Sequence, residues 1–175
     1  MTAEGRIASV NVNQGGVPKL PIDGAWVGPL GVEGDAHREP EPIHGGPDQA
    51  VCLYSVESIE RVARDGHTAF PGAFGENLTL EGIELGSLAA GDRLAIGEDG
   101  LLIEMTWPAT PCKTQAGWFI GGRFARISQK THPEDARWYA RVINPGRVAP
   151  GDEVARLRRG DDAEAAAAAE GASSN

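Results

Sequence analysis

Cysteine, long apolar runs and basic residues are all scarce in this sequence. Its 175 residues include two cysteines, and no uninterrupted apolar run exceeds five residues. Two cysteines 60 positions apart do not form a disulfide framework, and a membrane-spanning helix needs about 20 apolar residues. No apolar stretch of the kind found in signal peptides follows Met1–Arg6. These absences exclude a disulfide-rich secreted scaffold, and we expect a cytoplasmic protein without a membrane span.

Basic residues are outnumbered, with 16 lysines and arginines against 25 aspartates and glutamates, for a net charge of −9. Nonspecific nucleic-acid binding requires a basic face, so we expect no nucleic-acid partner. Residues 160–175 hold Asp161, Asp162, Glu164 and Glu170 but no bulky apolar side chain. Such a segment cannot offset its ordering entropy by burial. We therefore predict a single domain over residues 1–159 and a disordered, acidic, alanine-rich tail over residues 160–175.

Glycine and proline are plentiful, at 24 and 12 residues, and they disfavour a bundle of long helices. Arg6–Val12 alternates between two faces, which is typical of a strand. Asp99-Gly100 between two apolar runs predicts a hairpin. The predicted strands are Arg6–Val12, Ala50–Tyr54, Asn77–Leu80, Arg93–Ile96, Leu101–Thr106 and Val154–Leu157.

Two segments carry helix signals. Ser55 is suited to cap a helix over Val56–Arg64. Thr131 and Glu134 have the spacing of a capping box, which predicts a helix over Pro133–Val142. Many short strands with few helices favour a mainly β fold, a barrel or a sandwich, with a few short helices.

Gly31–Gly46 is a polar, glycine-punctuated segment and the first candidate site. The backbone N–H groups of Gly45 and Gly46 can approach an anion closely, and Arg38 and His44 add positive charge. The alternative is a solvated surface loop. His37 and His44 lie seven positions apart, which fits no standard zinc spacing, so we do not expect a zinc site.

Two further segments place polar groups beside turns. Glu76 and Asn77 lie at the start of a predicted strand, where site residues are common, and the alternative is an ordinary turn. Phe70 and Phe74 are predicted to anchor that loop to the core. Arg123, after a Gly-Gly pair, can hold a phosphate, as can Arg126.

The two cysteines have different surroundings. Cys112 follows Pro111 and precedes Lys113, whose charge favours the thiolate, the form of cysteine that acts as nucleophile and metal ligand. A chance loop thiol is the alternative. Cys52 lies within an apolar run and is predicted to pack as a small buried hydrophobe.

Taken together, the segments resemble MOSC domains, which are named for the C-terminal domain of molybdenum cofactor sulfurase. The motifs in their order along the chain are HGGPDQAVCLY, FPGAFGENLTLEGI, GDRLAIG, TPCKTQ and NPGRVAPGDEV. The resemblance spans Ile7–Leu157 and is greatest to the small stand-alone bacterial members. One departure is Ile43 before His44, where those members carry a second histidine.

The resemblance implies a barrel-like β fold that binds a molybdenum cofactor of the molybdopterin type. The family's characteristic cysteine matches Cys112, which ligates molybdenum in the reductase branch and is thought to carry sulfur in the sulfurase branch. Similar bacterial members reduce N-hydroxylated bases and related N-oxygenated compounds. The loops that match the family's cofactor pocket are His44–Asp48 and Glu76-Asn77.

From this resemblance we assign site residues. Cys112 is the expected metal ligand, and His44, Asp48 and Asn77 are expected to orient the substrate or relay protons. The groups expected to bind the cofactor are Arg38, His44, Gly45, Gly46, Glu76, Asn77, Lys113 and Arg123. No iron–sulfur or flavin motif is visible, so we expect a separate electron-donor protein carrying one of these groups.

Three functions remain open on the sequence alone. The first is a molybdenum-dependent oxidoreductase that reduces a small N-oxygenated molecule. The second is a sulfur carrier or sulfurtransferase with a persulfide on Cys112. The third is a non-enzymatic domain that binds the molybdenum cofactor or serves interaction only.

Overall fold

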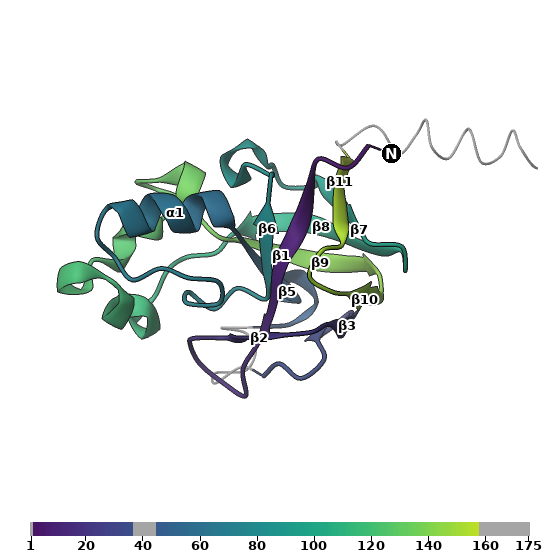
Figure 1. Ribbon diagram of the computed structural model, residues 1–175, viewed down its shortest axis with the longest axis horizontal. Helices are drawn as coiled ribbons and strands as arrows, with labels where there is room; N and C mark the ends of the chain where they lie inside the picture. Colours follow the sequence, from purple (N-terminus) through teal and green to yellow (C-terminus); the bar gives the residue numbers. More distant parts are fainter. Residues whose placement is uncertain (1, 37–44, 158–175) are drawn as a thin grey trace, which may run out of the picture.

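The computed structural model describes residues 2–36 and 45–157, in which β-strands predominate. Seven of the strands close into a barrel, in which β11 pairs back onto β1 through Val154 opposite Gly5. The mainly β barrel predicted from the sequence is therefore confirmed (Figure 1). In order around the barrel the strands are β1 (Gly5–Val12), β6 (Leu78–Glu81), β5 (Val51–Ser55), β9 (Trp138–Asn144), β8 (Leu101–Pro108), β7 (Arg93–Ile96) and β11 (Glu153–Leu157).

Neighbouring barrel strands are antiparallel except for β5 and β6, which run parallel. Parallel neighbours need a crossover connection, and here it contains the helix α1 (Val56–Arg64). The hairpin predicted around Asp99-Gly100 joins β7 to β8, with Ile96 opposite Leu101.

Four short strands lie outside the barrel. β2 (Leu20–Ile22) extends the sheet beyond β1, and a separate small sheet contains β10 (Gly146–Val148), β3 (Ala25–Gly28) and β4 (Gly31–Val32). None of these four strands was predicted from the sequence. Each has four residues or fewer, which is too short to show alternation between two faces.

The barrel interior is filled by aliphatic side chains from every strand. Residues at alternate positions point inward, as in β8, where Leu101, Ile103 and Met105 are at most 1% exposed. Tyr54 and Phe74 meet edge to face within this core, with ring centroids 5.7 Å apart. One continuous core therefore supports the loops at the end of the barrel.

The helix α1 forms as predicted. The hydroxyl oxygen of Ser55 accepts a hydrogen bond from the backbone N–H of Ser58 at 3.2 Å, which caps the first turn. Ile59 and Val62 face the core. With nine residues, α1 is the longest helix in the part of the chain that the structure describes, and no helix there could cross a membrane.

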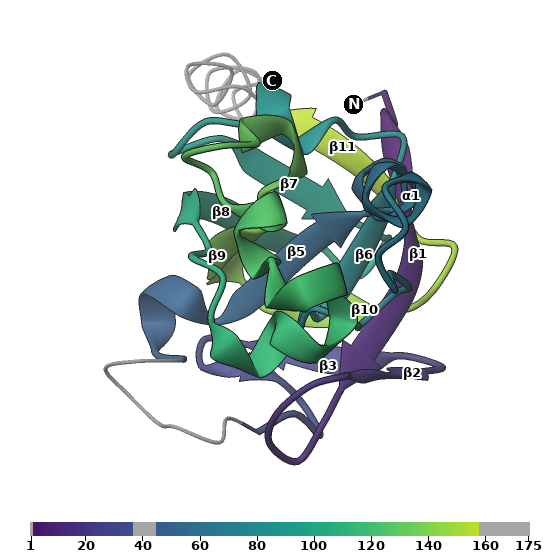
Figure 2. The same cartoon turned by 90° about the vertical axis from the view of Figure 1, so that its left-hand side faces the viewer.

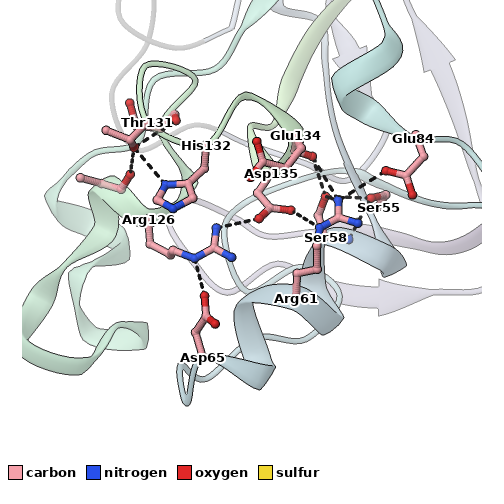
Figure 3. A network of polar contacts seen from close by, with 12 residues as sticks. Ser55, Ser58, Arg61, Asp65, Glu84, Arg126, Thr131, His132, Glu134 and Asp135 are labelled. Atoms are coloured by element: carbon pink, nitrogen blue, oxygen red, sulfur yellow. Dashed lines mark hydrogen bonds and ion pairs between the residues drawn. The ribbon is translucent and has the colours of Figure 1, made fainter.

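The helix predicted over Pro133–Val142 is wrong. Pro133–Asp135 form only a 3-10 turn, η6, and Trp138–Asn144 form the barrel strand β9. The Thr131 hydroxyl donates to the carbonyl of Ala125 at 2.9 Å instead of capping a helix (Figure 3).

Tertiary ion pairs fix the segment before β9. The Asp135 carboxylate is 1% exposed and accepts hydrogen bonds from Arg61 Nε at 2.8 Å and Arg126 Nη1 at 2.6 Å (Figure 3). These contacts tie η6 to α1, which carries Arg61, and to the 3-10 turn η5 (Phe124–Ile127), which carries Arg126. Local helix signals were thus overridden by a buried carboxylate whose two arginine partners lie 74 and 9 positions away in the sequence.

The remaining described helices are single 3-10 turns or short runs of them. They are η1 (Pro47–Gln49), η2 (Leu85–Ser87), η3 (Lys113–Trp118), η4 (Ile120–Gly122) and η5 (Phe124–Ile127). The green segment from η3 to η5 lies on the same side of the molecule as α1 (Figures 1 and 2). The rings of Phe119 and Phe74 stack with centroids 5.0 Å apart, and those of Trp118 and Phe70 meet edge to face with centroids 5.1 Å apart. Phe70 and Phe74 therefore anchor their loop, as predicted.

Candidate functional site

A cavity of about 580 Å³ is the candidate site. Its wall is formed by the loop after β1 (16–19), the loop before β6 (74–77), the end of β8 with the loop that follows (107–115), and the start of β9 (137–139). Both cysteines of the chain, Cys52 and Cys112, line it. A concave pocket of this size with convergent polar groups is typical of a small-molecule site.

Cys112 occupies the N-cap position of η3, in the loop that leaves β8. Its thiol is partly exposed and lies 2.8 Å from the hydroxyl oxygen of Thr114. Its backbone N–H donates to Gln115 Oε1 at 2.9 Å. Because Gln115 is 2% exposed and its Nε2 donates to the carbonyl of Phe74 at 2.7 Å, the cysteine loop is tied to the wall of the cavity.

Arg137 is a buried cation in the wall of the cavity, and it was not predicted from the sequence as a site residue. It precedes β9, is 5% exposed, and its Nη1 donates to the carbonyl of Phe74 at 2.6 Å. The same Nη1 lies 4.0 Å from Cys52 Sγ. Arg137 fell within the erroneous helix 133–142. The alternating pattern of Trp138, Ala140 and Val142 was the signal that could have revealed the strand instead.

A second network of hydrogen bonds and an ion pair supports the part of the cavity wall that contains Asn77 and Lys19. Asn77 Oδ1 accepts a hydrogen bond from the backbone N–H of Cys52 at 3.1 Å, and Asn77 Nδ2 donates to the Asp35 carboxylate at 2.9 Å. Lys19, which lines the cavity, forms an ion pair with Asp35, and the side chains of both are at least nine-tenths buried. Asn77 is therefore held by fixed partners and orients this part of the wall.

Cys52 is buried, as predicted for a packing residue, yet it also lines the cavity. Burial raises the pKa of its thiol, and the nearby Arg137 guanidinium only partly opposes this effect. Tyr139, paired with Cys52 across β5 and β9, also lines the cavity. Burial raises the pKa of Tyr139 to about 12, so its phenol remains a neutral hydrogen-bond donor at physiological pH.

Four of the residues assigned from the sequence are brought together by the structure. Asn77, Cys112, Lys113 and Gly45 all line the cavity. Arg38 and His44 lie outside the described residues. Trp107, which had no predicted role, contributes a ring that is 41% exposed. Trp107 lies near the end of β8, one residue beyond the predicted strand Leu101–Thr106, so the strand pattern gave no signal for it.

Four assigned residues are not brought into the described wall of the cavity. Gly46 precedes η1, and the Asp48 carboxylate lies 3.2 Å from Arg141 Nε. Arg123 is exposed, and its Nε donates to the carbonyl of Ile120 at 3.1 Å. Glu76 is fully buried. Burial raises its pKa, and its Oε1 accepts the backbone N–H of Gly72 at 2.7 Å, so it supports the loop from within.

The charge of the cavity is opposite in sign to that of the chain. Lys19, Lys113 and Arg137 line it, and the described lining residues include no aspartate or glutamate. Residues 2–36 and 45–157 contain no group of three His, Cys, Asp or Glu side chains placed to hold a metal ion. An anionic ligand with one thiolate contact therefore fits this cavity better than a metal ion held by protein ligands alone.

Known proteins resemble this chain in both sequence and structure. The model of the MOSC domain matches residues 40–155. Protein YiiM of Escherichia coli (strain K12) is 34% identical over 161 residues, which cover 87% of this chain and 70% of YiiM. A protein named reductase, from Gibberella moniliformis, is 29% identical over 137 residues, which cover 74% of this chain and only 23% of that protein. A crystal structure described as that of a hypothetical protein superposes with a TM-score of 0.73 at 29% identity, over 90% of this chain and 70% of that one.

Proposed function

The chain belongs to the MOSC domain family, and on that premise we propose that it binds a molybdenum cofactor and reduces N-hydroxylated bases or related N-oxygenated compounds. In this proposal Cys112 is the protein's ligand to molybdenum. The resemblance of the motifs to the reductase branch of the family supports it. So does the similarity to a protein named reductase, although this chain spans less than a quarter of that protein's length.

A soft sulfur donor in the wall of a cationic cavity is the observation that carries the proposal. Thiolate suits molybdenum better than hard oxygen ligands do. A molybdopterin carries a phosphate group, for which Lys113 and Arg137 offer charged donors. A cavity of about 580 Å³ lies within the usual range for cofactor sites. The described residues therefore fit the group in both charge and donor chemistry.

Three residues that line the cavity would hold the cofactor. Cys112 would bind the metal, and Gly45 and Lys113 would bind the pterin and its phosphate. When bound, the cofactor supplies the two-electron centre that reduction of an N–OH group requires and that no side chain provides. Reduction consumes two electrons and two protons and converts N–OH to N–H and water.

The chain's own residues would orient the substrate and move protons. Asn77 keeps its amide in a fixed position, because both of its polar atoms are engaged by the protein. Tyr139 offers a neutral phenol O–H at the wall, and its high pKa keeps that proton available. A role for His44 or Asp48 in proton transfer remains part of the proposal. The two electrons would come from a separate protein that carries a flavin or an iron–sulfur cluster.

Metal analysis of matched cysteine variants tests this proposal. The protein is purified gently from a host that makes the cofactor, and molybdenum is measured per chain together with pterin fluorescence. We expect close to stoichiometric molybdenum in the wild type and in C52S, and loss of the metal in C112S. Reduction of a hydroxylaminopurine with an artificial electron donor should follow the same pattern. Wild-type turnover in C112S would refute the ligand role, and bound cofactor without any turnover would favour a non-enzymatic binding protein.

A sulfur carrier is the second candidate, favoured by the partial exposure of Cys112. A persulfide forms when a nucleophilic thiolate attacks the outer sulfur of a donor persulfide and releases the donor's thiolate, and this requires access to the accepting sulfur atom. Cys112 is accessible, whereas Cys52 is buried. Incubation with a desulfurase should then add one sulfur atom to the wild type and to C52S but not to C112S, as measured by intact mass. A wild type that stays unmodified would exclude this function.

A further inference from the structure

One segment of this acidic chain is basic throughout. Residues 105–133 contain no aspartate or glutamate, and their four basic residues are Lys113, Arg123, Arg126 and Lys130. Because the whole chain has a net charge of −9, the residues outside this stretch sum to −13. We call residues 113–130, which include η3, η4 and η5, the basic segment. A local field opposite in sign to that of the rest of the chain attracts and orients an acidic molecule.

The basic segment keeps most of its charge at the surface. Arg126 is the exception, since its guanidinium pairs with Asp65 and with Asp135, each at 2.6 Å. The other three are exposed, and among residues 2–36 and 45–157 no carboxylate lies within ion-pair distance of them: Lys113, Arg123 and Lys130. The described fold therefore leaves three positive charges open to a partner in solution.

The basic segment starts at the residue that follows Cys112. Cys112 is the N-cap of η3, and Lys113 lines the cavity. From there the segment runs through η4 and η5 along the face turned toward the viewer in Figure 2. A protein that docks on this face therefore lies beside the loop that carries the thiol, and electron transfer is fast only over short distances.

The backbone of the basic segment is held by the loop that follows α1. The N–H of Ile120 donates to Nδ1 of His67 at 3.1 Å, and the carbonyl of Trp118 accepts the backbone N–H of Thr68 at 2.9 Å. The side chain of Ile120 is 53% exposed and adds an apolar contact among the charged side chains. A preformed face with exposed cations suits a brief protein encounter, in which charge sets the rate of association.

We propose that the basic segment is the docking surface for the separate electron-donor protein and that this donor presents an acidic face. The inference rests on the proposed function, which requires such a donor, and it names the surface and the charge by which the donor is recognised. Two reduced donor molecules dock in turn, and each is oxidised by one electron. The two electrons, with two protons from water, convert one N–OH group to N–H and water.

Turnover with protein donors and with a small dye tests this surface in the molybdenum-loaded, full-length protein. The protein donors are flavodoxin and a plant-type ferredoxin, two small acidic electron carriers, and the dye is reduced methyl viologen. R123E and K130E each reverse one exposed charge outside the described lining of the cavity. At an ionic strength of about 10 mM we expect kcat/KM for the protein donors to fall about threefold in each variant and about tenfold in the double variant. Turnover with the dye should stay at the wild-type level, which also shows that the variants fold.

R147E is the matched control for the change in net charge. Arg147 is exposed, and no carboxylate of the described residues lies within ion-pair distance of it. It lies on β10, at the other side of the molecule from η3 to η5 (Figure 1), so R147E should use both protein donors like the wild type. Raising the ionic strength from about 10 to about 150 mM shortens the Debye length from about 30 to about 8 Å, so the wild type and R123E/K130E should converge.

Direct binding separates this inference from the proposed function. Calorimetry at low ionic strength measures the affinity of oxidised flavodoxin for the cofactor-free protein. Binding that is lost in R123E/K130E, together with no dye-driven turnover in the wild type, would retain the docking surface and refute the proposed reaction. Dye-driven turnover that neither protein donor can replace would overturn the docking surface, as would equal losses in R123E and R147E.

Discussion

Replacing Asp135 by asparagine should destabilise the whole domain, because this carboxylate joins two arginines from different parts of the chain. Its side chain is 1% exposed, whereas those of Arg61 and Arg126 are 27% and 14% exposed. Breaking a fully buried ion pair costs about 3–5 kcal/mol. Since water reaches both arginines in part, we expect a loss near the lower limit, about 3 kcal/mol. An asparagine amide would also direct N–H groups toward one of the arginines.

For a domain of this size, such a loss corresponds to a fall in melting temperature of roughly 6–12 °C. The assay is urea unfolding with calorimetry on wild type, D135N and D65N. Asp65 is the matched control, since it pairs with the same Arg126 at 2.6 Å but is 51% exposed. We expect D65N to melt close to the wild type, because exposed ion pairs contribute little. A D135N protein that loses less than about 1 kcal/mol, or no more than D65N, would refute the reasoning.

Two further predictions concern the loop that supports Asn77. Because burial raises the pKa of Glu76, folding favours its protonated form. Its contribution to stability is therefore fully present below about pH 4.5, the ordinary pKa of a glutamate, and is lost as the pH rises through the higher pKa of the folded protein. Urea unfolding at several pH values should show that the free energy of unfolding of E76Q rises relative to that of the wild type as pH increases. A difference between the two proteins that stays constant with pH would contradict this. Gly72 has φ of +87°, and a Cβ there would lie 2.0 Å from the Lys19 carbonyl oxygen, so G72A should lose about 3 kcal/mol. G151A, with φ of +95° and no atom within 4 Å of the added Cβ, should lose clearly less, and equal losses would refute a steric origin.

Features with local causes were predictable from the sequence. The Ser55 cap and the Asp99-Gly100 hairpin depend on residues within a few positions of one another, and both formed as predicted. The pattern around Cys112 likewise indicated a thiol on a loop, and in the structure it lies, partly exposed, in the loop that leaves β8. These elements follow from backbone preferences that act before tertiary contacts are made.

Features with distant causes were not predictable in the same way. Asp135 formed a turn instead of a helix start because two arginines outside the turn, one of them 74 positions away in the sequence, hold its carboxylate. Arg137 entered the cavity only because the strand that follows it pairs with β5 and β8. Cys52 was correctly predicted to be buried, but its position on the cavity wall depends on the loop that carries Phe74. Such placements depend on the closure of the barrel, which brings together segments that are far apart in the sequence.

The pairing of β1 with β11 also bears on how the chain folds during synthesis. Gly5, near the start of the chain, finds its partner in Val154, so the ring cannot close until almost the whole domain has left the ribosome. Until then β1 and β7 each have an unpaired edge, the kind of edge that promotes association between nascent chains. Contacts this distant in sequence are slow to form. The barrel therefore closes only once β11 is available to pair with β1, and the complete wall of the cavity, which draws on segments from residue 16 to residue 139, depends on that barrel.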